Sequence, residues 1–113
     1  MATIYTIHAA RPEHLDAVIA SMRGMGAPTI RVVDCGDHYM ALEGTHRLHA
    51  AQTLGLAPRL VVIDQDADLD ITAFDWYDAA NFSETVYPAG EIAAEVYSPS
   101  QAQALRFDTV EVL

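Results

Sequence analysis

The stretch from Tyr39 to Pro58, YMALEGTHRLHAAQTLGLAP, changes its pattern at one point, and this change constrains the fold most strongly. Residues 38–43 read as a β-strand, whereas residues 45–54 have helical spacing and are followed by Gly55, which is typical of a helix end. The strand pattern breaks at Glu43–Gly44, and only Gly44 lies between the two ranges. The chain must therefore turn from a strand directly into a helix, so both kinds of element belong to one folded unit.

The rest of the chain extends this alternation. Strands are expected at residues 2–8, 29–34, 38–43, 59–64 and 107–112, and helices at 13–23, 45–54, 72–77 and from Ser98 onward. Residues 90–97 give no assignment. The length of 113 residues fits a single domain spanning 1–113. We expect an α+β fold, a small mixed β-sheet flanked by helices.

Local signals refine several of these elements. Either Gly24 or Gly26 is expected to end the first helix. Thr72 is expected to cap the short helix together with Asp75. The apolar run in strand 59–64 predicts burial on both of its faces.

The charge composition excludes one large class of partners. Sixteen acidic residues face six arginines and no lysine, giving a formal net charge of −10. Duplex nucleic acid is held mainly through Lys and Arg contacts to phosphates, so we expect no DNA partner. Any anion must be held locally, in a pocket.

Compartment signals are few. The single cysteine, Cys35, excludes an internal disulfide. The first residues lack the pattern of a secretory signal, and apolar runs are far shorter than the roughly 20 residues that span a bilayer. We expect a cytoplasmic protein with no membrane partner.

Residues 43–47, EGTHR, carry the chemistry expected of an anion site. A helix begins there, and the first amides of a helix lack partners and carry partial positive charge. Gly44 lets the backbone approach a ligand, and Thr45, His46 and Arg47 add a hydroxyl, an imidazole and a guanidinium. These residue types predict phosphate binding.

A purely structural interpretation of the same residues stays open. Thr45 would cap the helix, Arg47 would pair with Glu43 four residues earlier, and Gly44 would only form a tight turn.

The order of elements around this motif resembles the ParB/sulfiredoxin superfamily over about residues 13–64. Members carry a G-x-H-R or related element followed by a small-residue helix and L-G, as in residues 44–55 here. The chain has Thr45 where sulfiredoxins have a catalytic cysteine, and it lacks the helix-turn-helix domain of chromosome-partitioning members. It is most similar to the small ParB-like kinases that phosphorylate free serine, which carry D-G-x-H-R.

The resemblance implies roles for individual residues. Gly44, Thr45, His46 and Arg47 would bind the phosphates of ATP or ADP. Glu43 would hold Mg²⁺ or accept a proton. Glu13, near the start of the first helix with His8 and His14 close by, would be the general base, and Asp64 would be a second magnesium ligand.

The function expected from this resemblance is nucleotide-phosphate binding, with phosphoryl transfer to a small-molecule hydroxyl as the specific activity. The alternatives are a non-catalytic nucleotide-binding or interaction module and, against the acidic composition, a ParB-like nuclease. A homo-oligomer is compatible with the sequence.

Two further patterns have two interpretations each. Residues 64–70, DQDADLD, begin like a calcium loop but lack its glycine, so a solvated acidic loop is the other interpretation. The aromatic residues between 74 and 82 either stack on a purine or cover the core.

Overall fold

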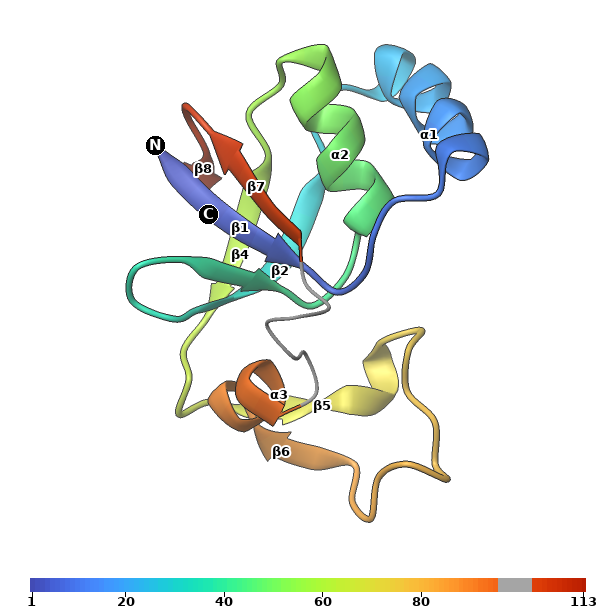
Figure 1. Ribbon diagram of the computed structural model, residues 1–113. Helices are drawn as coiled ribbons and strands as arrows, with labels where there is room; N and C mark the ends of the chain where they lie inside the picture. The colour runs from blue at the N-terminus through green and yellow to red at the C-terminus, as the bar shows by residue number, and fades with distance from the viewer. Residues whose placement is uncertain (96–102) are drawn as a thin grey trace.

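The computed structural model describes residues 1–95 and 103–113, and its main feature is a six-stranded sheet (Figure 1). The elements along the chain are β1 (Ala2–Thr6), α1 (Pro12–Met25), β2 (Thr29–Asp34), β3 (Tyr39–Ala41), α2 (Thr45–Leu54), β4 (Arg59–Ile63), β5 (Asp68–Asp70), the 3₁₀ turn η1 (Ile71–Ala73), β6 (Val86–Pro88), α3 (Ala89–Glu95), β7 (Gln103–Phe107) and β8 (Glu111–Val112). The predicted α+β class with a mixed sheet is confirmed, whereas the ParB/sulfiredoxin-like fold stays a prediction.

The large sheet has the order β7-β1-β3-β2-β4-β8. β1 pairs with β3 in parallel and with β7 in antiparallel. β2 and β3 form an antiparallel hairpin, and β2 also pairs in parallel with β4. A second, two-stranded sheet is formed by β5 and β6.

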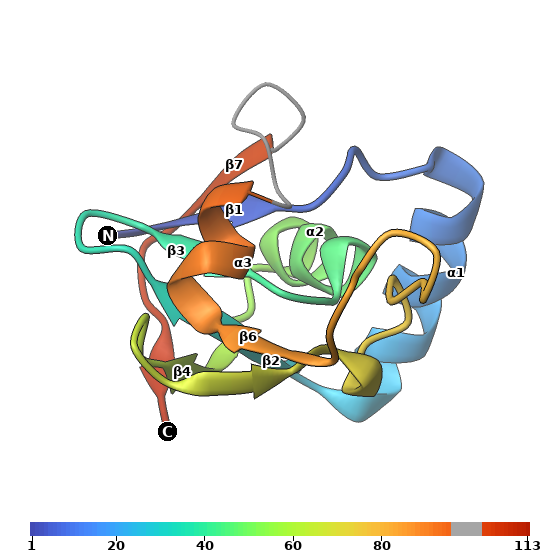
Figure 2. The same ribbon diagram turned by 90° about the horizontal axis from the view of Figure 1, so that it is seen from below.

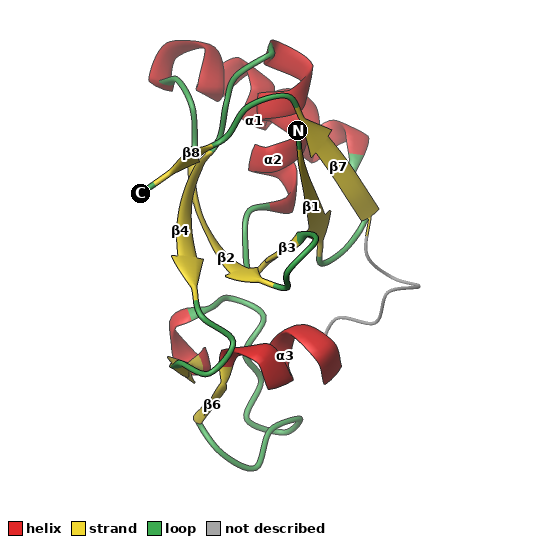
Figure 3. Cartoon of the chain, turned by 90° about the vertical axis from the view of Figure 1, so that its left-hand side faces the viewer, coloured by secondary structure: helices red, strands yellow, loops and turns green. Residues whose placement is uncertain are grey.

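The molecule has three layers. Helices α1 and α2 lie on one side of the large sheet, and α3 with β5 and β6 lies on the other (Figure 3). Viewed from below, α3 and β6 lie in front of the sheet and α2 lies behind it (Figure 2). Because successive strand residues point to opposite faces, the central strands supply side chains to both sides.

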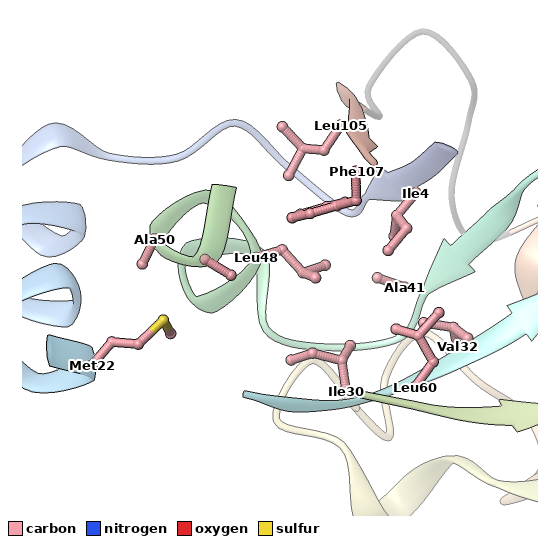
Figure 4. Close-up of a cluster of buried hydrophobic side chains, with 11 residues drawn as sticks. Ile4, Met22, Ile30, Val32, Ala41, Leu48, Ala50, Leu60, Leu105 and Phe107 are labelled. Carbon is pink, nitrogen blue, oxygen red and sulfur yellow. The ribbon is translucent and has the colours of Figure 1, made fainter. Parts of the chain in front are cut away.

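The first core fills the space between the sheet and the helices (Figure 4). Its fully buried members include Ile4, Ile30 and Leu60 from strands and Leu48 from α2. Met22 is the buried residue of α1, and the rest of that helix's apolar stripe packs partly buried against the cluster. Both helices therefore contribute one face to this core.

The second core lies on the opposite face of the sheet. Val33 and Met40, neighbours of first-core residues along β2 and β3, point into it and meet Ile71, Phe74 and residues of α3. Trp76, Tyr77 and Phe82 pack against this cluster partly buried. The interpretation of these aromatic residues as a cover for the core is confirmed.

Helices α1 and α2 each end at a glycine. Gly26 ends α1 with φ of 81°, and the Gly26 N–H donates to the carbonyl of Met22. Gly24 therefore lies within the helix. Gly55 ends α2 in the same left-handed region. Among the described residues, no helix combines the length and apolar character needed to cross a membrane.

Four local predictions need correction, and one lies outside the described residues. Asp70, not Thr72, caps η1, because its carboxylate accepts the Thr72 N–H. The expected strand at 107–112 is two strands, β7 and β8, on opposite edges of the sheet. The helix predicted from Ser98 lies outside the described residues.

The other two corrections concern segments near β4 and α3. Val61 in β4 is 38% exposed because the second layer does not cover it, so burial on both faces is wrong there. The segment 90–97 has no assignment from the sequence, and α3 (Ala89–Glu95) covers its first part.

Candidate functional site

A pocket of about 500 Å³ opens at the N-terminus of α2. Its walls are residues 7–8 after β1, His14 and Val18 of α1, residues 43–47, and residues 73–75 at the end of η1. All four residues predicted to bind phosphate, Gly44 to Arg47, line this pocket. The structure therefore brings them together with segments that are distant in the sequence.

The first turn of α2 lacks a side-chain cap. Gly44 occupies the cap position with φ of 73° and ψ of 34°, in the left-handed region that favours glycine. A Cβ at this position would also collide with Cδ1 of the buried Ile30 and approach the guanidinium of Arg47. Glycine is therefore required here by backbone angle and by space, and the first amides of α2 are not satisfied by a capping side chain.

Thr45 is buried in the pocket wall with an unsatisfied hydroxyl. The residue is only 3% exposed, and its Oγ1 has no hydrogen-bond partner among the described residues. It does not cap the helix, which is the role of the structural interpretation. A buried polar atom without a partner is costly in a folded protein, so this hydroxyl is suited to a ligand.

Glu43 is bound firmly by Arg31. The Nε and a terminal nitrogen of Arg31 donate to the two carboxylate oxygens at 2.7 and 2.9 Å, and the Arg31 backbone N–H adds a third bond at 3.1 Å. The hydrogen bond from Arg31 holds the pKa of Glu43 below its ordinary value, although burial opposes this. A carboxylate held ionised by three donors is a weak base, and its oxygens are already occupied.

Arg31 also connects the pocket to the second core. Its guanidinium lies 4.2 Å above the centre of the Phe74 ring, a cation–π arrangement. The Trp76 indole N–H donates to the Leu42 carbonyl at 2.7 Å, immediately before Glu43. The backbone entering α2 is thus held at two successive residues, Leu42 and Glu43.

Arg47 is the more accessible cation of the site. Its side chain is 43% exposed, with one terminal nitrogen 3.7 Å from Glu43 and the other donating to the Thr29 carbonyl at 3.3 Å. The pairing with Glu43 expected by the structural interpretation is present but long. An exposed guanidinium with one weak ion pair can turn to a ligand at little cost.

His46 is a buried, neutral ring. It is 8% exposed, and its Nε2 accepts the Arg11 backbone N–H at 2.9 Å. Burial lowers the pKa of His46, and the groups around it that can carry positive charge lower it further. With Nε2 accepting, the proton belongs on Nδ1, so this N–H is the one donor the ring can offer.

The remaining predicted residues lie elsewhere. Glu13 is exposed in the first turn of α1 and is not part of the pocket wall. Asp64 lines a separate hollow beside Asp34 and Asp66. In the described ranges, no three His, Cys, Asp or Glu side chains are placed to hold a metal ion. The two residues predicted to hold Mg²⁺, Glu43 and Asp64, line different pockets, so the structure does not bring them together.

The pocket also contains residues that were not among those predicted to bind phosphate. Phe74 and Asp75 reach it from η1, and Asp75 forms no ion pair with any described residue. His8 and His14 line it as well, although the sequence suggested them only as neighbours of Glu13. No local pattern could have found this grouping, because it depends on how α1 and η1 pack.

Comparisons of the chain with family models, with curated proteins and with solved structures found no match.

Proposed function

We propose that this protein binds a nucleotide through its phosphate groups at the N-terminus of α2. The observation that carries the proposal is the Thr45 hydroxyl, which is buried in the pocket wall without a partner among the described residues. It lies beside the uncapped first turn of a ten-residue helix and beside the exposed cation Arg47. These groups are the donors from which proteins build phosphate sites.

The donors of this site act over short distances, so they can bind a negatively charged phosphate although the chain itself is negatively charged. The chain has a net charge of −10, so a phosphate gains little from the protein's long-range field. Helix amides, a hydroxyl and one guanidinium act over a few ångströms and remain effective in such a molecule. The same charge disfavours extended nucleic acid, so nuclease activity is the weaker candidate.

Two observations favour binding without turnover over the kinase reaction implied by the resemblance. Glu43 is held ionised by Arg31, and Glu13 lies outside the pocket wall. Neither carboxylate is therefore positioned to remove a proton from a hydroxyl beside the phosphates. A turnover assay with labelled ATP or ADP and free amino acids tests this, and a phosphorylated product would support the kinase.

The binding proposal is tested by calorimetry with ADP, with and without magnesium. Arg47→Ala should weaken binding by about 1.5–3 kcal/mol, the value of a hydrogen bond to a charged group. The matched control is Arg59→Ala, because Arg59 pairs with Glu111 on the exposed edge of the sheet. Equal affinity of the two variants would contradict the proposed site.

Thr45→Val separates binding from stability. Because the hydroxyl has no partner among the described residues, its removal should leave thermal stability unchanged or raise it by up to about 1 kcal/mol. Binding of ADP should nevertheless weaken by about 0.5–1.5 kcal/mol. A variant that is clearly destabilised but binds ADP normally would assign the hydroxyl a structural role instead.

A further inference from the structure

Three histidine rings meet at the edge of the pocket, from three different parts of the chain. The ring of His14, on α1, stacks on that of His46 with centroids 4.2 Å apart and planes inclined by 13°. The ring of His8, in the segment after β1, lies 5.5 Å from the same ring. All three residues line the pocket that contains Thr45.

The three rings differ in the protonation state that their surroundings allow. His46 is buried and receives the Arg11 N–H on Nε2, so gaining a proton would cost it this bond. His8 and His14 are exposed to solvent. The Nδ1 of His8 lies 2.8 Å from the Ala9 carbonyl, to which it must donate, so Nε2 is the nitrogen that can take up a proton.

The charges around these rings are mixed. Arg11 and Arg47 disfavour further positive charge, and His49 is a further neighbour of His46. On the acidic side, Glu43 is already paired with Arg31, Asp75 is exposed, and Glu13 precedes His14 in α1. An anion in the pocket would change this balance, because each protonated ring would then have an unpaired negative charge beside it.

We propose that His8 and His14 form the second half of the anion site, and that they select a terminal phosphate by taking up protons when it binds. The proposal rests on the phosphate site of the proposed function. A terminal phosphate carries close to two negative charges near neutral pH, whereas a phosphodiester carries one. Histidine changes its charge in the same pH range, so the two rings can match the second charge without a metal ion.

The expected behaviour is proton-linked binding. The protons come from solvent and are released when the phosphate leaves. Because both rings are exposed, each should contribute about two- to fivefold in affinity, the range of an exposed ion pair. The effect should be larger at pH 6 than at pH 8, because binding that takes up protons is favoured at lower pH.

The test is calorimetry of AMP binding to the full chain at pH 6, 7 and 8, with wild type, His8→Gln, His14→Gln and the double variant. Taking the ratio of wild-type to variant affinity removes the titration of AMP itself. The ratio for the double variant should be about four- to twentyfold at pH 6 and below about twofold at pH 8. His38→Gln is the matched control, because His38 pairs with Asp37 at the hairpin turn and is not part of the pocket wall.

The cyclic phosphodiester of adenosine supplies the second arm. It should bind more weakly than AMP at pH 6 and lose little from the double substitution. A ratio that does not change with pH, or one shared by His38→Gln, would overturn the role of the two rings. If wild type binds AMP and Arg47→Ala weakens it while these ratios stay flat, this inference fails and the proposed function stands. If wild type binds neither nucleotide at any pH, both fail.

Discussion

The backbone of the proposed phosphate site at the start of α2 requires glycine at position 44. The loss of folding stability in Gly44→Ala measures this requirement. Alanine in the left-handed region costs about 1–2 kcal/mol. Its Cβ would also collide with Cδ1 of Ile30, which is fully buried in the first core, and overpacking of this kind costs about 1–3 kcal/mol. Together the two effects predict a loss of about 2–5 kcal/mol in the free energy of unfolding.

Gly55→Ala is the internal control for the backbone contribution. Gly55 has nearly the same φ, 69° against 73°, but a Cβ there would meet nothing within 4 Å. It should therefore cost only the backbone term of about 1–2 kcal/mol. Urea unfolding followed by circular dichroism measures both losses, and their difference isolates the collision.

A double-mutant cycle tests the cause directly. Ile30→Val removes Cδ1 and should cost about 0.5–1.5 kcal/mol alone. In that background, Gly44→Ala should lose only its backbone term, so the combined cost should fall about 1–3 kcal/mol short of the sum. Strictly additive costs, or equal losses for Gly44→Ala and Gly55→Ala, would refute the packing argument.

Two further substitutions test the contacts that hold the strand-to-helix junction. Glu43→Gln should lower the free energy of unfolding at pH 7 by about 1–2 kcal/mol. This is less than the roughly 1.5–3 kcal/mol of a charged hydrogen bond, because Arg31 is 36% exposed and solvent screens the pair. Folding lowers the pKa of Glu43, so this stabilisation is present above the unfolded pKa of about 4.3 and is lost as the pH falls through the folded pKa. The difference in free energy of unfolding between wild type and Glu43→Gln should therefore disappear in acid. Denaturant unfolding at several pH values from 7 to 3 measures this difference, and Glu111→Gln, at an exposed ion pair, is the control. A difference that does not change with pH would contradict the pairing of Glu43 with Arg31. Trp76→Phe keeps an aromatic ring in the second core but leaves the Leu42 carbonyl without the indole donor. It should lower the free energy of unfolding, measured with urea, by about 1–2 kcal/mol. An unchanged free energy would mean that this hydrogen bond contributes no net stability.

Elements with strong local signals were predictable from the sequence. Helix α1 follows from its apolar periodicity, α2 follows mainly from the glycines at its two ends, and β2 follows from its β-branched residues. The physical reason is that periodicity and helix ends are decided within one or two turns of chain. The pocket wall at residues 44–47 was found for the same reason.

Features that depend on distant contacts were not predictable. Arg31 binds Glu43 across the β2–β3 hairpin, and nothing within residues 43–47 indicates that the carboxylate is already occupied. The division of the 107–112 segment into β7 and β8 depends on pairing with β1 and β4, at opposite edges of the sheet. Local alternation cannot reveal which partners a strand will meet.

The position of β1 has a consequence for how the protein is made. Of the strands in this sheet, β1 comes first in the sequence, yet it lies between β3 and β7, and Ile4 pairs with Leu105 of β7. The first core therefore cannot close until nearly all of the sequence up to Phe107 has been synthesised. Until then β1 has one open edge, so we expect this part of the nascent chain to need protection from aggregation until β7 has been made and can pair with it.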